Sequence, residues 1–416
     1  MDEEIKSVRG MRDILPQQTK LWQSAERLIF NVLEEFGFEE IRVPIVEDLK
    51  LFQRSVGIFT DIVQKEMYVF KDKGDRLLAL RPEATASVVR AYLQHRLYAK
   101  KRVTRLYYSG PMFRYDRPQK GRYRQFYQIG AEIFGGESPY FDAELMIILS
   151  RILQLLKINH YSFEINSVGC DRCKMEYSNI LQEFLSLRAN GLCQDCQTRL
   201  RTNVLRVLDC KAVSCRDIIK EAPSIYRIFC DGCRKHQEII YNCLIKHNIQ
   251  YIENQYLVRG LDYYTMTVFE LKINGEETAV AGGGRYNNLV KDLGGPHTPA
   301  AGFAIGMDRL CDSVAPETNR VIEVFVFFLG EKALEQGTIL INNARTDGIK
   351  LILDYNERSL KNHLKVADRE GVEHVLILGD NELAQKIFLY RNMKNRSQRQ
   401  VNFDQLFNFF KGLKNV

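Results

Sequence analysis

The feature that most constrains this chain is a pair of distant segments that place charged and polar side chains in hydrophobic, strand-like surroundings. They are FRYDRPQKGRYRQFYQIGAE, residues 113–132, and LVRGLDYYT, residues 257–265. Crowding arginines, tyrosines, glutamines and carboxylates into such surroundings costs folding free energy, because each polar group must find a partner away from water. The pattern therefore predicts a site that holds a charged, nitrogen-rich ligand.

The length and composition indicate a folded protein of more than one domain. At 416 residues the chain is too long for one ordinary core, so two or three domains are expected. Apolar residues make up 45% and charged residues 27%, which is typical of a globular protein. The sequence has no apolar run of 18 residues, and its start, MDEEIKSVRG, is unlike a signal peptide, so we expect a cytoplasmic location and no membrane partner.

The charge is mildly positive and unevenly placed. Lysine and arginine number 59 against 52 acidic residues, a net charge of +7, which permits a polyanionic partner without requiring one. Residues 100–124 contain nine basic residues and a single acidic residue, Asp116. A solvated helix face is one interpretation, but Pro111, Pro118 and Gly121 disfavour a long helix. A strand–loop–strand unit that binds phosphates fits this segment better.

Periodicity predicts a first half that mixes helices with hairpins. Helices are expected over 17–36, from near Pro82, and over 141–156, and strands over 41–46 and 161–166. Hairpins are expected over 68–80, turning at 73–74, and over 104–134. Pro44 cannot donate to a sheet ladder, so it belongs at an edge, a bulge or an interface.

The second half divides into three stretches. Residues 170–254 are helical in character and lie between segments of one sheet, so we interpret them as an insertion. Strands are expected over 257–273 and around the glycine run 281–286, followed by a strand that enters a helix over 300–310. From about Val321 strands and helices alternate up to a last strand and a last helix, which predicts a small βαβ-type domain with parallel strands.

Eight of the ten cysteines fall in four closely spaced pairs, Cys170 and Cys173, Cys193 and Cys196, Cys210 and Cys215, and Cys230 and Cys233. This spacing is typical of structural zinc sites. Disulfides are disfavoured in a reducing compartment. Reduced thiols in a core or on the surface are the other interpretation, and the sequence leaves the two open.

Together with VRGMRDILP at residues 8–16 and GMDRL at 306–310, the two polar segments closely resemble the histidyl-tRNA synthetases, a class II aminoacyl-tRNA synthetase family. The resemblance covers nearly the whole chain and implies an α+β fold. Residues 1–320 would form the class II catalytic domain with its antiparallel sheet and the helical insertion at 170–254, and residues 321–416 an α/β anticodon-binding domain. Pro44 would then mark the first class II motif, which builds a homodimer interface.

The resemblance implies a histidine–tRNA ligase, which activates L-histidine with ATP and Mg2+ and transfers it to the 3′ end of tRNA(His). Activation is an in-line attack of a carboxylate on the α-phosphate, so the enzyme positions anions and neutralises charge. Arginine suits this task, because its planar fork binds phosphate and keeps its charge. By resemblance, Arg114 contacts the α-phosphate and the substrate carboxylate, and Arg259 lies on the opposite side of that phosphate.

The other roles implied by the resemblance concern the remaining parts of the two substrates. Arg309 would hold the far end of ATP, and Phe126 would stack on adenine. A selective pocket for imidazole needs partners for both a donor and an acceptor. The matching positions are Glu83, Thr85 and Gln128 at the amino and carboxylate end, Glu132 and Tyr264 facing the imidazole, and Tyr263 beside them. None of these residues is expected to bind a metal.

Three of these residues also have a plain structural interpretation. Glu83 alone is more often a charge at a helix start, and Tyr263 and Tyr264 alone would be a strand with one residue in the core and one outside. The chain departs from the family pattern at Met266, where glycine usually follows LDYYT, and at Asn287 and Asn288, which puts fine selectivity in doubt.

Two rival functions fit the sequence less well. A catalytically inactive regulatory subunit of ATP phosphoribosyltransferase shares the catalytic fold, but such paralogues usually lose the RGLDYY signature and the C-terminal domain, and this chain retains both. A pure RNA-binding module would not explain Glu132 or Tyr264. The insertion of the family is not generally a metal domain, so zinc there remains an open possibility.

Overall fold

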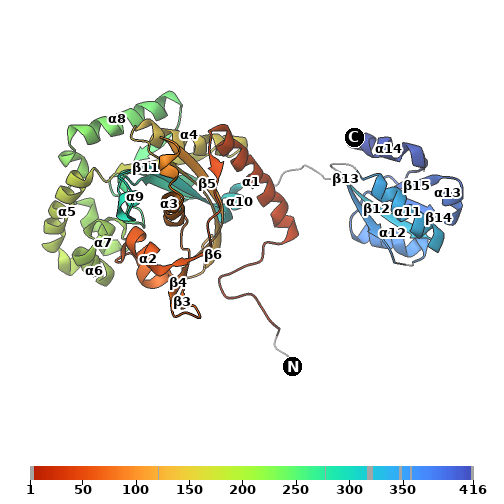
Figure 1. Ribbon diagram of the computed structural model, residues 1–416, viewed down its shortest axis with the longest axis horizontal. Coiled ribbons are helices and arrows are strands. Elements are labelled where there is room, and N and C mark those ends of the chain that lie inside the picture. Colours follow the sequence, from red (N-terminus) through yellow and green to blue (C-terminus); the bar gives the residue numbers. More distant parts are fainter. Residues whose placement is uncertain are drawn as a thin grey trace. The chain divides into compact units, whose positions relative to one another are not determined.

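A computed structural model describes residues 4–119, 121–276, 278–315, 322–345, 349–356 and 358–413. The chain divides into two compact units, Met1–Pro316 and Glu317–Val416, and each is described by itself (Figure 1). Among the described helices, none combines the length and the apolar character needed to cross a bilayer.

An eight-stranded sheet forms the centre of the first unit. In spatial order its strands are β1 (Glu39–Glu40), β5 (Thr104–Phe113), β6 (Gln125–Phe134), β11 (Ala300–Gly306), β10 (Ala281–Arg285), β9 (Thr265–Ile273), β7 (Tyr161–Ser167) and β8 (Tyr251–Glu253). Pairing is antiparallel from β5 through to β7, and β1 and β8 join the two edges in parallel. The predicted antiparallel sheet and the hairpin over residues 104–134 are confirmed.

Helices cover one face of this sheet and leave the other for the site. α1 (Pro16–Glu35), α4 (Tyr140–Leu155), α8 (Asp231–Lys246) and α10 (Met307–Ser313) share one hydrophobic core with alternate residues of β6, among them Ile129 and Ala131. Successive residues of a strand point to opposite faces. Gln128 and Glu132 therefore point away from these helices.

A small three-stranded sheet flanks the main one, with the order β2 (Val46–Asp48), β4 (Leu77–Leu80), β3 (Val69–Lys71). The predicted hairpin over 68–80 is confirmed. The predicted strand over 41–46 is wrong, because residues 41–45 lie outside any strand between β1 and β2. Here Arg81 replaces ladder bonds, donating to the carbonyls of Val43 at 2.9 Å and Pro44 at 3.4 Å. Pro44 has no N–H to donate in return.

The short helices near this sheet are α2 (Leu49–Phe52), α3 (Thr85–Gln94) and α9 (Leu289–Asp292), with π-helical turns over Gln53–Gly57 and Ile62–Glu66 and a 3-10 turn over Leu97–Ala99. α3 begins later than the predicted start near Pro82. Glu83 therefore lies before the helix, not in its first turn.

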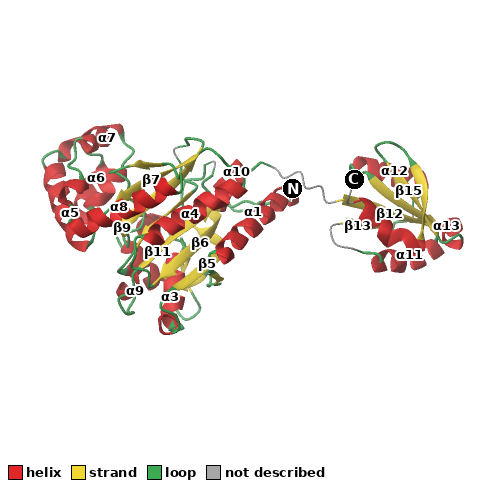
Figure 2. Cartoon of the chain, turned by 90° about the horizontal axis from the view of Figure 1, so that it is seen from above, coloured by secondary structure: helices red, strands yellow, loops and turns green. Residues whose placement is uncertain are grey.

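The segment between β7 and β8 is helical, as predicted, and gathers at one side of the unit (Figures 1 and 2). It contains α5 (Asp171–Ser186), α6 (Gln194–Thr202), α7 (Val213–Lys220) and α8, with 3-10 turns over Ala189–Gly191, Val204–Asp209 and Ile225–Ile228. The strand predicted over 257–273 is correct only from Thr265. Residues 257–264 form a loop.

The second unit is a five-stranded sheet with helices. Its strand order is β13 (Ile349–Asp354), β12 (Ile322–Leu329), β14 (His374–Gly379), β15 (Ile387–Asn392), β16 (Gln398–Asn402). The helices are α11 (Glu331–Asn343), α12 (Leu360–Arg369), α13 (Asp380–Ala384) and α14 (Leu406–Leu413), with a 3-10 turn over Phe403–Gln405. β12 pairs in parallel with β13 and β14, as predicted. The predicted last strand is instead an antiparallel pair, β15 and β16.

Candidate functional site

A cavity of about 840 Å3 opens on the face of the large sheet that α1 and α4 leave uncovered. Strands β6, β9, β10 and β11 supply its floor, and the loop before β9 and part of the insertion supply its walls. Five of the predicted site residues line it, namely Arg114, Phe126, Gln128, Arg259 and Arg309. Residues that are far apart in the sequence thus meet at one place.

Positive charge converges on this cavity. Arg309 extends from α10, and its guanidinium donates to the carbonyls of Gly121 at 2.8 Å and Ala279 at 2.6 Å. Burial, and then the charges of Arg122, Arg114 and Arg259, lower the pKa of Arg309. Like charges that are brought this close favour an anionic ligand between them.

Arg259 is held at the cavity by both its backbone and its side chain. Its guanidinium pairs with Glu270 of β9, and its carbonyl accepts from Arg206 at 2.9 Å. A Cβ atom at Gly282 of β10 would lie 2.6 Å from this guanidinium, so only glycine leaves room for it. Arg259 Nε is buried and has no hydrogen-bond partner among the described residues.

Arg114 follows β5 and lies over the Phe126 ring, with 5.3 Å between its Cζ and the ring centroid. Its Nε donates to the carbonyl of Pro82 at 2.9 Å. Nearby, Gln128 Oε1 is a second buried atom without a partner in the described part of the chain. Buried polar atoms are usually paired, so an unpaired donor and an unpaired acceptor on one cavity mark places where a ligand can bind.

Glu132 lies in a buried polar cluster beside the cavity. Its Oε1 accepts from Thr85 Oγ1 at 2.7 Å, its Oε2 accepts from the Tyr286 hydroxyl, and only 1% of its surface is exposed. Burial raises the pKa of Glu132 to about 8. A Cβ atom at Gly302 of β11 would meet Glu132 Oε2 at 1.7 Å, so this carboxyl also depends on a glycine in the next strand.

Glu83 and the two tyrosines complete the cluster. The Glu83 carboxyl accepts from the N–H groups of Thr85 at 2.7 Å and Ala86 at 3.0 Å, and it therefore caps α3. Tyr263 and Tyr264 are both buried on a loop, with ring centroids 4.7 Å apart. The simple interpretation of these tyrosines as a strand with one residue inside and one outside is therefore wrong.

The structure thus brings the predicted residues together in two adjoining groups. Glu83, Thr85, Glu132, Tyr263 and Tyr264 form the buried cluster, whereas the arginines, Phe126 and Gln128 line the cavity. The charges of the two groups interact. Burial lowers the pKa of Arg114 in the cavity, and the charges of Glu66 and of Glu83 in the cluster raise it again in part.

Sequence reasoning did not single out three residues of this site. They are Glu270, which pairs with Arg259, Tyr286, which donates to Glu132, and Tyr108, which is fully buried near Glu132. The glycines of the strands are the sequence signal that could have indicated where these large side chains pack. Gly282 faces Arg259, and a Cβ atom at Gly130 would lie 2.3 Å from the Tyr108 ring.

The departures from the family pattern lie beside the cavity lining, not in it. Asn287 accepts from Arg285 at 3.3 Å, and Asn288 donates to Asp171 of α5 at 2.9 Å. Arg285 itself is structural, because it forms a buried ion pair with Asp142, and this pair lowers the pKa of that carboxyl. Met266 has φ +54°, a left-handed conformation that glycine adopts more easily.

Comparisons with known proteins agree with this arrangement. The family model described as histidyl-tRNA synthetase matches residues 10–189 and 199–310, and the model described as anticodon binding domain matches residues 323–413. A histidine–tRNA ligase of Thermodesulfovibrio yellowstonii is 46% identical over 96% of this chain and 96% of its own. One of Desulforapulum autotrophicum is 44% identical over 95% of this chain and 94% of its own.

Solved structures give the same result. The apo histidyl-tRNA synthetase of S. aureus covers 98% of this chain and 100% of its own, at 35% identity and a TM-score of 0.82. A Bacillus halodurans protein titled ATP phosphoribosyltransferase regulatory subunit/histidyl-tRNA synthetase reaches a TM-score of 0.66 over 91% of this chain and 99% of its own, at 19% identity, which shows a shared fold alone. The chain belongs to the histidyl-tRNA synthetase family.

Proposed function

We propose that this protein is a histidine–tRNA ligase that activates L-histidine with ATP and transfers it to the 3′ end of tRNA(His). One observation carries the proposal. A cavity surrounded by arginines, with Arg259 Nε and Gln128 Oε1 unpartnered among the described residues, adjoins the buried Glu132 cluster. An anion site next to a polar pocket suits a reaction between a triphosphate and an amino acid.

In this proposal the arginines act on ATP. Arg114 and Arg259 approach the α-phosphate from two sides and neutralise the charge that grows on its oxygens as the histidine carboxylate attacks. Arg309 binds the far phosphates, and Phe126 stacks on adenine. The cavity can also admit Mg2+ with the nucleotide, because this ion usually binds one or two carboxylates together with phosphate oxygens, and Glu270 and Glu66 line the cavity.

The buried cluster, together with Gln128 of the adjoining cavity, recognises histidine. Glu132 and Tyr264 face the imidazole, with Tyr263 beside them, whereas Glu83, Thr85 and Gln128 hold the amino and carboxylate groups. A carboxyl with a pKa of about 8 can accept a hydrogen bond as an anion or donate one as an acid. A competing amino acid that lacks the imidazole N–H would leave this buried carboxyl with only its Thr85 and Tyr286 partners, and the missing hydrogen bond is the proposed basis for rejection.

A homodimer and a tRNA partner belong to the same proposal. Large apolar side chains are exposed on the small sheet and the turn beside it, namely Ile45, Val46, Ile58, Phe59, Val69, Phe70 and Leu77. A concentrated apolar surface of this kind supports a subunit interface. The anticodon-binding domain, residues 321–416 within the second unit, is the proposed anticodon reader, and the proposed site of action is the cytoplasm.

The test is exchange of pyrophosphate into ATP, measured with each of the twenty amino acids. Exchange that depends on histidine alone, followed by charging of tRNA(His) and no other tRNA, is the expected result. No exchange with any amino acid would favour an inactive regulatory paralogue, and exchange with a different amino acid would overturn the assignment of the Glu132 pocket.

A further inference from the structure

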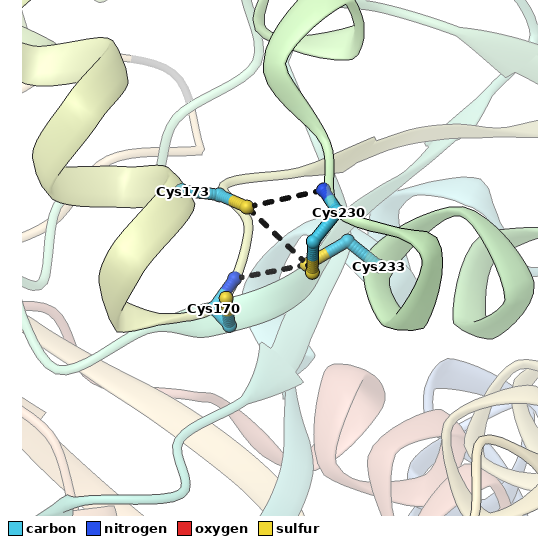
Figure 3. Close-up of side chains that lie close together, drawn as sticks. All are labelled: Cys170, Cys173, Cys230 and Cys233. Atoms are coloured by element: carbon cyan, nitrogen blue, oxygen red, sulfur yellow. Dashed lines mark hydrogen bonds between the residues drawn. The ribbon is translucent and has the colours of Figure 1, made fainter.

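The insertion contains two groups of four cysteines that the proposed reaction does not use. The first cluster consists of Cys170, Cys173, Cys230 and Cys233, and the second consists of Cys193, Cys196, Cys210 and Cys215. Within each cluster all four sulfur atoms lie within 4.8 Å of one another. Figure 3 shows the first cluster, in which two pairs from the starts of two helices point toward each other.

We propose that each cluster binds one zinc ion through four cysteine thiolates. In the first cluster the Sγ atoms of Cys230 and Cys233 are 3.5 Å apart and those of Cys233 and Cys173 are 3.9 Å apart, and in the second those of Cys193 and Cys210 are 3.7 Å apart. Four sulfurs at about 2.3 Å from a tetrahedral zinc ion are separated by about 3.8 Å, which matches these distances.

The distances exclude the two other arrangements of paired cysteines. A disulfide joins its sulfur atoms at about 2.0 Å, and all ten cysteines are free thiols in the structure. Four sulfurs in mutual contact leave room for a single ion, but not for the several iron atoms of an iron–sulfur cluster. Tetrahedral coordination by four thiolates is typical of zinc, and metal analysis distinguishes zinc from a single iron ion in the same geometry.

The backbone around the clusters favours the thiolate form. Cys170, Cys193 and Cys230 stand immediately before α5, α6 and α8, at the positive ends of the helix dipoles. Their N–H groups donate across the clusters. That of Cys170 reaches Cys233 Sγ at 3.3 Å and that of Cys230 reaches Cys173 Sγ at 3.3 Å (Figure 3). In the second cluster that of Cys193 reaches Cys215 Sγ at 3.2 Å. Such hydrogen bonds orient and stabilise metal-bound thiolates.

The burial pattern also fits a metal site better than ordinary thiols. In both clusters half-buried and buried cysteines alternate, so each cluster lies at the edge of the core, where an ion can enter. The first cluster joins cysteines 60 residues apart in the sequence, Cys173 and Cys233. Packing alone gives no reason for four sulfurs to meet twice in one insertion, whereas a shared ligand does.

The first cluster is connected to the loop that carries Tyr263 and Tyr264. Cys233 Sγ lies 3.8 Å from the sulfur of Met266, whose N–H donates to the carbonyl of Gly169 at 2.9 Å. From α5, which starts at this cluster, Lys174 donates to the carbonyl of Tyr264 at 2.8 Å. An ion here would fix α5 and, through it, the end of the loop.

The second cluster is connected to the other end of the same loop. Arg206 lies in the 3-10 turn that ends just before Cys210, and it donates to the carbonyl of Arg259 at 2.9 Å. Arg199 of α6 pairs with Asp61 at 2.7 Å and so ties the cluster's helix to the π-helical turn over Ile62–Glu66, which Asp61 precedes. Both ions would thus be structural and would position Arg259 and Tyr264, and the second ion would lie at the edge of the cavity, because Cys210 is among the lining residues.

The experiment is metal analysis of the full-length protein after expression in zinc-supplied medium. We expect about two equivalents of zinc per chain, and X-ray absorption that gives four sulfur ligands at about 2.3 Å. Cys230→Ser and Cys193→Ser should each lose about one equivalent. Cys243→Ser is the matched control, because Cys243 lies in α8 outside both clusters and its loss should leave the zinc content unchanged.

A second readout keeps the proposal separate from the proposed activity. Removing zinc with a chelator should lower the melting temperature of the wild type and make eight further thiols reactive, and added zinc should reverse both changes. Less than about a tenth of an equivalent of zinc, with the cluster thiols already reactive, would overturn the proposal. So would iron in place of zinc, or a thiol count reduced by disulfides.

Discussion

At the scale of single residues, the position of Arg259 decides how the cavity can act on a phosphate. Its side chain is half-buried and pairs with Glu270, and its buried Nε has no partner among the described residues. We predict that Arg259→Ala folds and dimerises normally but loses at least about 100-fold in pyrophosphate exchange, the usual loss when one preorganised charge donor is removed. Arg188→Ala, at an arginine that stacks on Phe184 in the insertion, is the control and should keep full activity. A variant that retains half its activity would exclude the proposed role of Arg259.

A substitution at Glu132 should affect the binding of histidine and leave the binding of ATP nearly unchanged. Its carboxyl is fully buried behind the cavity lining, with Thr85 and Tyr286 as partners. Glu132→Ala is predicted to raise KM for histidine and to lower pyrophosphate exchange severely. ATP affinity, measured by nucleotide titration, should change by less than about twofold, because the variant loses binding energy only where the imidazole is proposed to bind. Equal losses of affinity for histidine and for ATP would show that Glu132 does not belong to the histidine pocket.

The raised pKa of Glu132 also has a consequence for stability. Between the pKa of an ordinary glutamic acid and about 8, the folded protein holds a proton that the unfolded chain releases. The free energy of unfolding therefore falls as pH rises through this window. Glu132→Gln cannot ionise, so we predict that from pH 6 to pH 8 the wild type loses at least about 1 kcal/mol more than the variant in denaturant titrations. Parallel pH profiles would contradict a protonated Glu132.

At the scale of elements, the role of β10 depends on glycine, because a strand residue without a side chain leaves space for a neighbouring group. Its Gly282 leaves the space that the Arg259 guanidinium fills. We predict that Gly282→Ala folds, since the strand has ladder partners on both sides, but loses at least about tenfold in exchange as Arg259 is displaced from Glu270. Gly412→Ala is the control, because a Cβ atom there meets nothing within 4 Å. An active Gly282→Ala enzyme would show that Arg259 can bind the phosphate from another position.

Elements with strong local patterns were predictable, and those built by distant contacts were not. Period-3.6 and period-2 patterns gave α1, α4, β5, β6 and the alternation of the C-terminal unit. The loop over 257–264 has a strand-like sequence, yet side chains from the insertion hold it, including Arg206 and Lys174. In the segment over 41–45, the carbonyls of Val43 and Pro44 likewise accept from the side chain of Arg81. Such distant hydrogen-bond partners cannot be predicted from local periodicity.

The same division applies to the site. The arginines and carboxylates could be named from motifs, because their chemistry is visible in residue type. Glu270 and Tyr286 could not, since their roles arise from the register of β9 and β10, which pairs Glu270 with Gly282 beneath Arg259. The zinc question was likewise open from spacing alone, and only the convergence of separate cysteine pairs gave it a geometry.

At the scale of the whole molecule, the two compact units predict two separable activities. The proposed site residues all lie in Met1–Pro316, and Glu317–Val416 has its own sheet and core. Near the end of the second unit a basic group follows β15, with Lys394, Arg396 and Arg399 exposed. Such a surface suits phosphate contacts with tRNA. The affinity of these contacts falls steeply with rising salt, because the counterions that binding releases gain less entropy in a more concentrated salt solution.

We therefore predict that a chain ending at Pro316 still makes histidyl-adenylate but charges tRNA(His) poorly. Sedimentation and circular dichroism should first establish that the shortened protein is a folded dimer, because the apolar surface proposed for the interface lies wholly in its first 80 residues. In the full-length protein, tRNA affinity should fall with rising salt, and replacing Lys394 and Arg396 by glutamine should lower that salt slope by about one to two, since each lost phosphate contact removes a little under one unit. Lys361→Gln with Lys365→Gln, at two lysines of α12, is the matched control for charge. If the shortened chain charged tRNA as well as the whole protein, the C-terminal unit would not be the anticodon reader, and tRNA recognition would have to lie with the catalytic unit and its insertion.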